Sequence, residues 1–153
     1  MERTFFFGSI NAMSHKSGKI GELIQHLEGR GHDPHYLGYF ECFNRQMFYE
    51  SHDVLEELWL ECRETPRHEF YKALIQLAGA FVHLQKDRVY AAGKLFRLSR
   101  SYFVKYPETF EDVSTTSIIA LINDWHSRLE RDGFEKNPLT RDNSPILALP
   151  QSK

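Results

Sequence analysis

Residues 73–84, with the sequence ALIQLAGAFVHL, are apolar on nearly every side when they are placed on a helix. A helix without a polar face cannot lie on the surface, so other helices must cover it. This stretch also holds small side chains that let neighbouring helices approach closely, at Ala73, Ala78, Gly79 and Ala80. The chain is therefore expected to fold around one central, buried helix.

Further helices are predicted around the central one. The central helix is expected to begin with Thr65 as its N-cap and Pro66 in its first turn, and to run to about Lys86. The others carry apolar residues on one face and are expected at residues 17–28, 34–44, 47–62, 88–106 and 116–132. The last of them is expected to end at Gly133 and Phe134 in a Schellman-type cap. No stretch alternates in the manner of a strand, so the predicted fold class is all-α, a compact bundle of about five to six helices.

The two ends of the chain are expected to lie outside these helices. Residues 1–16 are interpreted as a leader that is disordered or not native, with Met13 as an alternative start. The tail, residues 137–150, contains three prolines and the apolar residues Ile146, Leu147 and Leu149. These features predict an extended C-terminal strap that packs on the bundle, and a single helical domain over residues 17–150.

Composition and charge narrow the function classes. A chain of 153 residues with 41% hydrophobic residues is long and apolar enough for one domain with a substantial core. A formal net charge of −2 gives no electrostatic reason to bind nucleic acid. No apolar run is long enough for a membrane span. The two cysteines, Cys42 and Cys62, form no redox or metal-binding motif, so a soluble, cytoplasmic protein with reduced thiols is expected.

Several common catalytic motifs are missing from the sequence. It contains neither the H-E-x-x-H motif of zinc proteases nor the E-x-x-H motif of di-iron helical bundles. It also lacks the glycine-rich phosphate-binding motifs and the G-x-S-x-G motif of serine hydrolases. Enzymes of those classes are therefore not expected.

Four polar side chains fall where the helical pattern predicts apolar ones. His52 and Glu56 lie one turn apart on an otherwise apolar face of the helix at 47–62. Gln76 and His83 are seven residues apart on the central helix, so they also share a face. A buried polar side chain without a partner costs roughly 1–3 kcal/mol, and helices joined by a short loop are usually antiparallel neighbours. The four side chains are therefore expected to meet across the interface between the two helices.

Three roles for this cluster stay open. In the first, Glu56 and Gln76 satisfy the histidines and fix the register of the helices, which is a structural role. In the second, His52 and Glu56 are a catalytic acid/base pair, in which the carboxylate orients the imidazole. In the third, His52, Glu56 and His83 bind a divalent metal ion and leave a position open for water. The sequence does not identify the metal or another cofactor.

Two blocks of the sequence resemble a known family. Residues 43–61, FNRQMFYESHDVLEELWLE, and residues 72–83, KALIQLAGAFVH, are similar to the family named domain of unknown function 309. The resemblance covers residues 36–106 and rests on matches at Phe43, Asn44, Glu50, His52, Leu55, Glu56, Trp59, Gln76 and His83. It implies a small helical bundle and a cytoplasmic setting, and it brings no established activity.

The chain departs from the family pattern at three positions. Gln46 and Ala73 stand where glycine is usual, and Asp53 stands where glutamate is usual. The change at Asp53 puts in doubt any role that needs the longer carboxylate. Asp53 lies about 100° around the helix from His52, so it is not expected to share a pocket with it.

The favoured interpretation is a helical bundle that binds a small ligand or a metal ion at the polar cluster, with acid/base, hydrolase-like chemistry. Ligand-binding residues are expected at Asn44, Phe48, Trp59, Gln76 and His83, with Tyr71 also lining the pocket. The alternative is a non-catalytic interaction or oligomerisation domain, with a structural cluster and a second copy of the chain as partner. A basic outer face on the helix at 88–106 and the additional helix at 17–28 suit that alternative.

Overall fold

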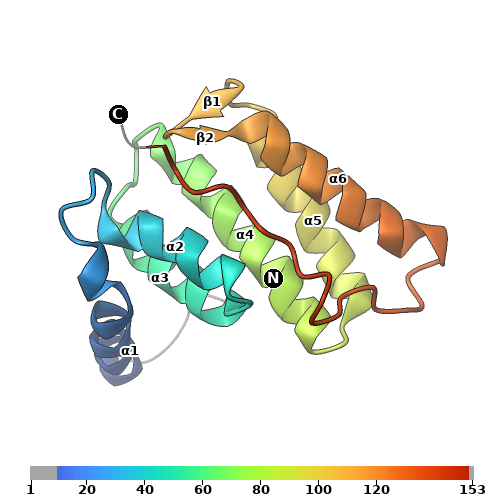
Figure 1. Cartoon of the computed structure of the whole chain (residues 1–153), viewed down its shortest axis with the longest axis horizontal. Coiled ribbons are helices and arrows are strands. Elements are labelled where there is room, and N and C mark those ends of the chain that lie inside the picture. Colours follow the sequence, from blue (N-terminus) through green and yellow to red (C-terminus); the bar gives the residue numbers. More distant parts are fainter. Residues whose placement is uncertain (1–9, 152–153) are drawn as a thin grey trace.

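The structure is a computed structural model that describes the backbone of residues 10–151 and the side chains of residues 17–151. The predicted all-α class is confirmed, because this part of the chain is a bundle of α-helices with one short 3-10 helix and one small hairpin (Figure 1). No helix within it is long and apolar enough to cross a membrane. The helices are α1 (Ile10–Ile24), η2 (Gln25–Leu27), α2 (Pro34–Asn44), α3 (Phe48–Leu60), α4 (Arg67–Gln85), α5 (Val89–Phe103) and α6 (Thr115–Arg131).

The central helix of the bundle is α4, as predicted. It packs between α3 and α5, while α2 lies against α3 and α6 against α5 (Figure 1). The ring of Phe81 in α4 is fully buried and meets one aromatic ring from each of these four helices, with centroids 5.0 to 5.6 Å apart. Its partners are Phe43 of α2, Phe48 of α3, Phe96 of α5 and Trp125 of α6. The main core is therefore built around one side chain of α4.

Two helices begin at positions that differ from the prediction. α1 begins at Ile10, ahead of the predicted start at residue 17, so it includes residues 10–16 of the segment that was interpreted as a leader. Residues 1–9, the rest of that leader, lie outside the described residues. At the start of α4, Thr65 does not serve as the N-cap. Its hydroxyl donates to the carbonyl of Cys62 at 2.7 Å and thereby closes the turn between α3 and α4.

A short hairpin that the sequence pattern does not predict joins α5 to α6. In it β1 (Thr109–Phe110) pairs in antiparallel fashion with β2 (Val113–Ser114). The turn residues Glu111 and Asp112 both have left-handed backbone angles, with φ of 49° and 61°. Asparagine and glycine usually occupy such a turn, so the common sequence signal of a hairpin is missing here. The Tyr36 hydroxyl donates to the carbonyl of Glu111 at 2.8 Å and helps to hold the turn in place.

The end of α6 has the predicted Schellman geometry. The Phe134 N–H donates to the carbonyl of Leu129 at 2.9 Å, and the Gly133 N–H donates to that of Glu130 at 3.0 Å. The Phe134 ring then lies against Gly93 of α5, where a Cβ atom would come within 2.7 Å of the ring. The absence of a side chain at Gly93 therefore lets the end of α6 pack closely on α5.

The C-terminal strap runs along the bundle between α2 and α6 (Figure 1, red). The Asn44 side chain binds it at two points, because its amide NH₂ donates to the Leu147 carbonyl at 2.9 Å and its Oδ1 accepts from the Leu147 N–H at 2.7 Å. Leu147 is 5% exposed, whereas Ile146 is 64% and Leu149 is 55% exposed. An extended segment points successive side chains to opposite sides. This alternation explains why Ile146 points away from the core while Leu147 points into it. Leu149 is exposed as well, so one of the three apolar side chains enters the core.

Replacing Leu147 by alanine is expected to lower the free energy of unfolding by about 2–4 kcal/mol, because it leaves a cavity in the core. Ile146→Ala is the matched control, since it removes an exposed side chain from the neighbouring position. It is expected to change the free energy of unfolding by less than about 0.5 kcal/mol. Chemical denaturation of the wild type and both variants measures the two effects. Equal losses in the two variants would contradict the described orientation of the strap.

α1 docks beside the bundle on a small apolar cluster that is separate from the main core. Ile20 and Ile24 of α1 pack with Cys42 of α2 and Val54 of α3. The backbone of α2 approaches α1 closely at Gly38, where a Cβ atom would lie 2.5 Å from Cγ2 of Ile24. A side chain at position 38 would therefore push α1 outward.

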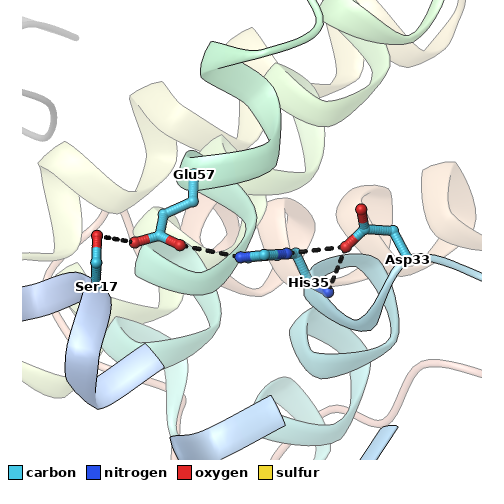
Figure 2. A network of polar contacts seen from close by, with 4 residues as sticks. All are labelled: Ser17, Asp33, His35 and Glu57. Atoms are coloured by element: carbon cyan, nitrogen blue, oxygen red, sulfur yellow. Dashed lines mark hydrogen bonds and ion pairs between the residues drawn. The ribbon is translucent and has the colours of Figure 1, made fainter. Parts of the chain in front are cut away.

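A polar network ties α1 to α2 and α3 (Figure 2). The Ser17 hydroxyl of α1 donates to Oε2 of Glu57 on α3, and Oε1 of Glu57 lies 2.9 Å from Nε2 of His35. On its other side, Nδ1 of His35 lies 2.8 Å from Oδ1 of Asp33, the N-cap of α2. The bond to Asp33 raises the pKa of His35, burial partly offsets this rise, and the bond to Glu57 adds to it. Two carboxylates thus favour the protonated ring.

The His35 network is expected to stabilise the fold more at pH 6 than at pH 9. The raised pKa means that the folded protein holds the His35 proton more tightly than the unfolded chain. Its contribution is therefore complete below the ordinary histidine pKa of about 6.5 and is lost as the pH rises through the raised pKa of the folded protein. His35→Gln is expected to lower the free energy of unfolding by up to about 1 kcal/mol at pH 6, and by less at pH 9.

Denaturation of the wild type and His35→Gln at both pH values measures this difference. The matched control is His126→Gln, which removes another histidine that faces a carboxylate, 3.4 Å from Glu130 on the distant α6. A loss in His35→Gln that is equal at the two pH values would show that protonation of His35 does not strengthen the network.

Candidate functional site

Two ring contacts fix the register of α3 on α4. At the start of α3, Phe48 stacks on Phe81 with ring centroids 5.0 Å apart. At the end of α3, Trp59 stacks on His68, near the start of α4, also at 5.0 Å. The start of one helix therefore meets the end of the other, and the two are antiparallel, as predicted. The middle of α3 is level with the middle of α4.

Polar and aromatic side chains follow this pair of helices and form a group that we call the polar seam. Its members are His52, Asp53, Glu56 and Trp59 from α3, and His68, Lys72, Gln76 and His83 from α4. The register of the helices places His52 level with Gln76, and Glu56 level with Lys72. His68 and Lys72 were not expected at the site. His68, Lys72 and Gln76 follow one another at intervals of four residues, and this spacing is the signal that would have found the first two.

The seam buries its polar groups deeply. His52 is 2% exposed, and Glu56 and Gln76 are each 4% exposed. Apart from these residues and Asp53, the buried polar residues in the described part of the chain carry only hydroxyl groups, at Ser51, Ser99 and Thr115. Burial of a carboxylate or an imidazole costs much more free energy than burial of a hydroxyl group. The polar seam therefore holds the buried imidazole and carboxylate side chains of the described residues.

Asp53 is close to His52, although the sequence pattern placed it on another side of the helix. Its Oδ1 lies 2.9 Å from Nδ1 of His52, so the expectation that the two do not share a pocket is wrong. The two residues are adjacent in the chain, so the Asp53 carboxylate can reach the His52 ring although their side chains leave the helix about 100° apart. In the neutral ring, the proton on Nδ1 is donated to Asp53 and the basic lone pair is on Nε2. A paired carboxylate and imidazole is a common unit for proton transfer.

The other two histidines of the seam favour the neutral form. Burial lowers the pKa of His83, and the nearby charges of Arg88 and Lys86 lower it further. Burial likewise lowers the pKa of His68, with a further contribution from Lys72. Both rings can therefore accept a hydrogen bond or a proton at neutral pH.

Three residues that were expected to bind a ligand have other contacts. Phe48 is fully buried in the aromatic core against Phe81. Asn44 uses its side-chain amide to hold the strap. The Tyr71 hydroxyl donates to the carboxylate of Glu111 in the hairpin turn at 3.0 Å. These contacts are structural, so we leave Phe48, Asn44 and Tyr71 out of the proposed site.

A metal ion needs several ligands at one point. Among the residues that the structure describes, no three histidine, cysteine, aspartate or glutamate side chains come together in this way. His83 lies seven residues beyond Gln76, which is level with His52, and this spacing corresponds to about 10 Å along α4. His52, Glu56 and His83, the expected metal ligands, are thus spread along the seam.

A groove of about 470 Å³ lies between α1 and the start of α3. This volume is within the usual range for small-molecule sites. Residues of the groove come from both elements: Lys19, Ile20, Glu22 and Leu23 from α1, and Met47, Tyr49, Glu50 and Asp53 from the start of α3. Asp53 belongs both to the groove and to the pair with His52, so the groove and the seam meet at this residue.

Comparison with known proteins supports the resemblance seen in the sequence. A family model described as "Domain of unknown function (DUF309)" matches residues 36–95. This range contains all of α3 and α4 and therefore every residue of the polar seam, whereas α1 lies outside it. Searches of curated proteins and of solved structures gave no match. The resemblance predicted from the sequence is thus confirmed over residues 36–95, which match the DUF309 family model.

Proposed function

We propose that this protein binds a small polar molecule where the groove meets the polar seam, and that His52 and Asp53 act on it as an acid/base pair. The observation that carries the proposal is the joint burial of His52, Asp53, Glu56 and Gln76, since the other buried polar residues in the described part of the chain carry only hydroxyl groups. Burying ionisable groups reduces the stability of the fold. Ligand pockets nevertheless contain a few precisely placed polar groups, because these groups bind and orient the ligand. The groove supplies access, because Asp53 lines it.

Each residue of the proposed site has a distinct role. Asp53 orients the His52 ring through Nδ1, so that Nε2 can take a proton from the bound molecule and return it. Gln76, at the same level on α4, offers both a hydrogen-bond donor and an acceptor that can fix the ligand. Glu56, one turn along α3 from His52, supplies a second carboxylate. The reaction is a proton transfer of the kind that starts a hydrolysis or an isomerisation.

A ligand screen on the full chain tests the binding step. Small amines, carboxylic acids, esters and divalent metal ions are the probes, and a rise in melting temperature is the signal. A hit from the screen is expected to lose its effect in His52→Gln and in Glu56→Gln. Asp124→Asn is the matched control, because this α6 carboxylate pairs only at the surface with Arg128, 2.9 Å away. A hit that all variants bind equally would place the ligand outside the seam.

Stability separates a binding site from a purely structural cluster. If the seam serves a ligand, His52→Gln and Glu56→Gln are each expected to change the free energy of unfolding by less than about 1 kcal/mol, because water from the groove can solvate the remaining groups. If the seam only holds the helices together, each change leaves a buried charge without its partner and lowers the free energy of unfolding by roughly 3–5 kcal/mol.

Chemical denaturation of the two single variants and the double variant distinguishes these cases. Large losses in both singles that are mostly relieved in the double variant would favour the alternative, a non-catalytic interaction domain with a structural cluster. Small losses in all three, together with loss of ligand binding, are the expected result.

A further inference from the structure

The groove between α1 and α3 carries more negative than positive charge. Its walls hold three carboxylates, Glu22, Glu50 and Asp53, and one ammonium group, that of Lys19. Three negative charges against one positive charge leave a formal balance of −2. A groove of one prevailing charge attracts ligands of the opposite charge. The electrostatics therefore favour a cation over an anion.

The remainder of the lining is apolar or aromatic. Ile20 and Leu23 come from α1, and Met47 and Tyr49 come from the start of α3. The Tyr49 ring is 53% exposed, and it already attracts one cation, because the Lys86 ammonium lies 6.0 Å from its centroid. Organic ammonium groups bind to tyrosine faces in the same manner. These walls suit a ligand that has an apolar part as well as a charged end.

Tyr49 and Asp53 also connect the groove to the proposed reacting group. The ring centroids of Tyr49 and His52 are 6.1 Å apart, and Asp53 is bonded to His52. A carboxylate has about four acceptor positions, so Asp53 can orient His52 and still accept from a ligand. A cation held against these two residues lies next to the His52 ring.

The α1 wall of the groove is held firmly in place. Ile20 and Ile24 pack in the apolar cluster beneath α1, and Ile24 lies directly over Gly38. The Ser17 hydroxyl adds a polar tie to Glu57, which is itself held by His35 (Figure 2). The wall is thus a built part of the fold. It lies outside residues 36–95, the part that matches the family.

We propose that the groove binds a small organic ammonium ion with an apolar substituent. The ammonium group binds near Glu50, Asp53 and the face of Tyr49, and the substituent lies against Ile20, Leu23 and Met47. The inference rests on the proposed function only for what happens next to His52, since binding itself depends on the groove. α1 sets the size of the substituent that fits, and its Glu22 adds to the preference for positive charge that Glu50 and Asp53 of α3 create.

A matched ligand series on the full chain tests the charge preference. The probes are 2-phenylethylamine, 2-phenylethanol and 3-phenylpropionate, which share an apolar part and differ in the polar end, together with ethylamine, which lacks the ring. Isothermal titration at low salt is expected to show that the arylalkylamine binds at least about tenfold more tightly than the alcohol, and that the carboxylate binds most weakly. Added salt is expected to weaken binding of the amine.

Variants of the groove locate the binding. Glu50→Gln and Glu22→Gln are expected to weaken binding of the arylalkylamine roughly three- to tenfold, because each removes one attractive charge. Glu130→Gln, in the exposed α6, is the matched control and is expected to leave it unchanged. Leu23→Ala is expected to weaken binding of the arylalkylamine but not of ethylamine. Melting curves of the variants show that each remains folded.

The outcomes separate this inference from the proposed function. If the alcohol or the carboxylate binds as tightly as the amine, or if Glu50→Gln and Glu22→Gln have no effect, the ammonium inference is overturned. The acid/base proposal still stands in that case if another ligand is lost in His52→Gln. If the amine binds and depends on Glu50, but no ligand or reaction depends on His52, the ammonium inference stands and the acid/base proposal falls.

Discussion

The contacts of Phe81 constrain the rest of the molecule. Because one ring of α4 meets a ring from each of α2, α3, α5 and α6, none of these helices can shift along α4 without losing a central contact. Aromatic pairs also prefer particular angles, so the packing restricts rotation as well as position. The stacking on Phe48 fixes one end of α3, and the stack of Trp59 on His68 fixes the other. These ring contacts therefore determine how the polar side chains of α3 and α4 are placed relative to one another in the polar seam.

The seam and the α1 wall of the groove come from different parts of the chain. The seam lies wholly within the range that matches the family, on α3 and α4. One wall of the groove belongs to α1, which has its own apolar cluster and its own polar ties to α2 and α3. This arrangement lets the residues of α1 vary without disturbing the main core. In the proposed function, the chemistry and the choice of ligand can therefore change independently.

The helical framework follows closely from the sequence, because amphipathic periodicity and helix-end signals depend only on neighbouring residues. The apolar stretch around Phe81 and the glycine after Asp132 are signals of this local kind. The misses depend on distant partners. The hairpin turn at Glu111 and Asp112 is supported by Tyr36, far earlier in the chain, and not by turn residues of its own. In the same way, no local pattern shows that the Asn44 amide holds a strap far along the chain.

The candidate site could likewise be predicted only in part. The buried positions of His52, Glu56 and Gln76 could be predicted, since a polar residue on an apolar face is visible in the sequence. The position of Asp53 could not be predicted from helical spacing, because spacing gives the direction of Cβ and not the path of the rest of the side chain. Its carboxylate bends back to His52, and this contact turns an isolated imidazole into a pair.

The two hydrogen bonds between Asn44 and Leu147 also matter for the order in which the chain folds. These two residues are separated by 103 positions, so their contact closes a very long loop. Closing such a loop costs conformational entropy before the contact contributes favourable free energy. Contacts of this kind therefore tend to form late in folding. A contact that is absent from the folding transition state has little influence on the folding rate and acts mainly on the rate of unfolding. The contacts of the strap are therefore expected to slow unfolding of the native state and to have little effect on the folding rate.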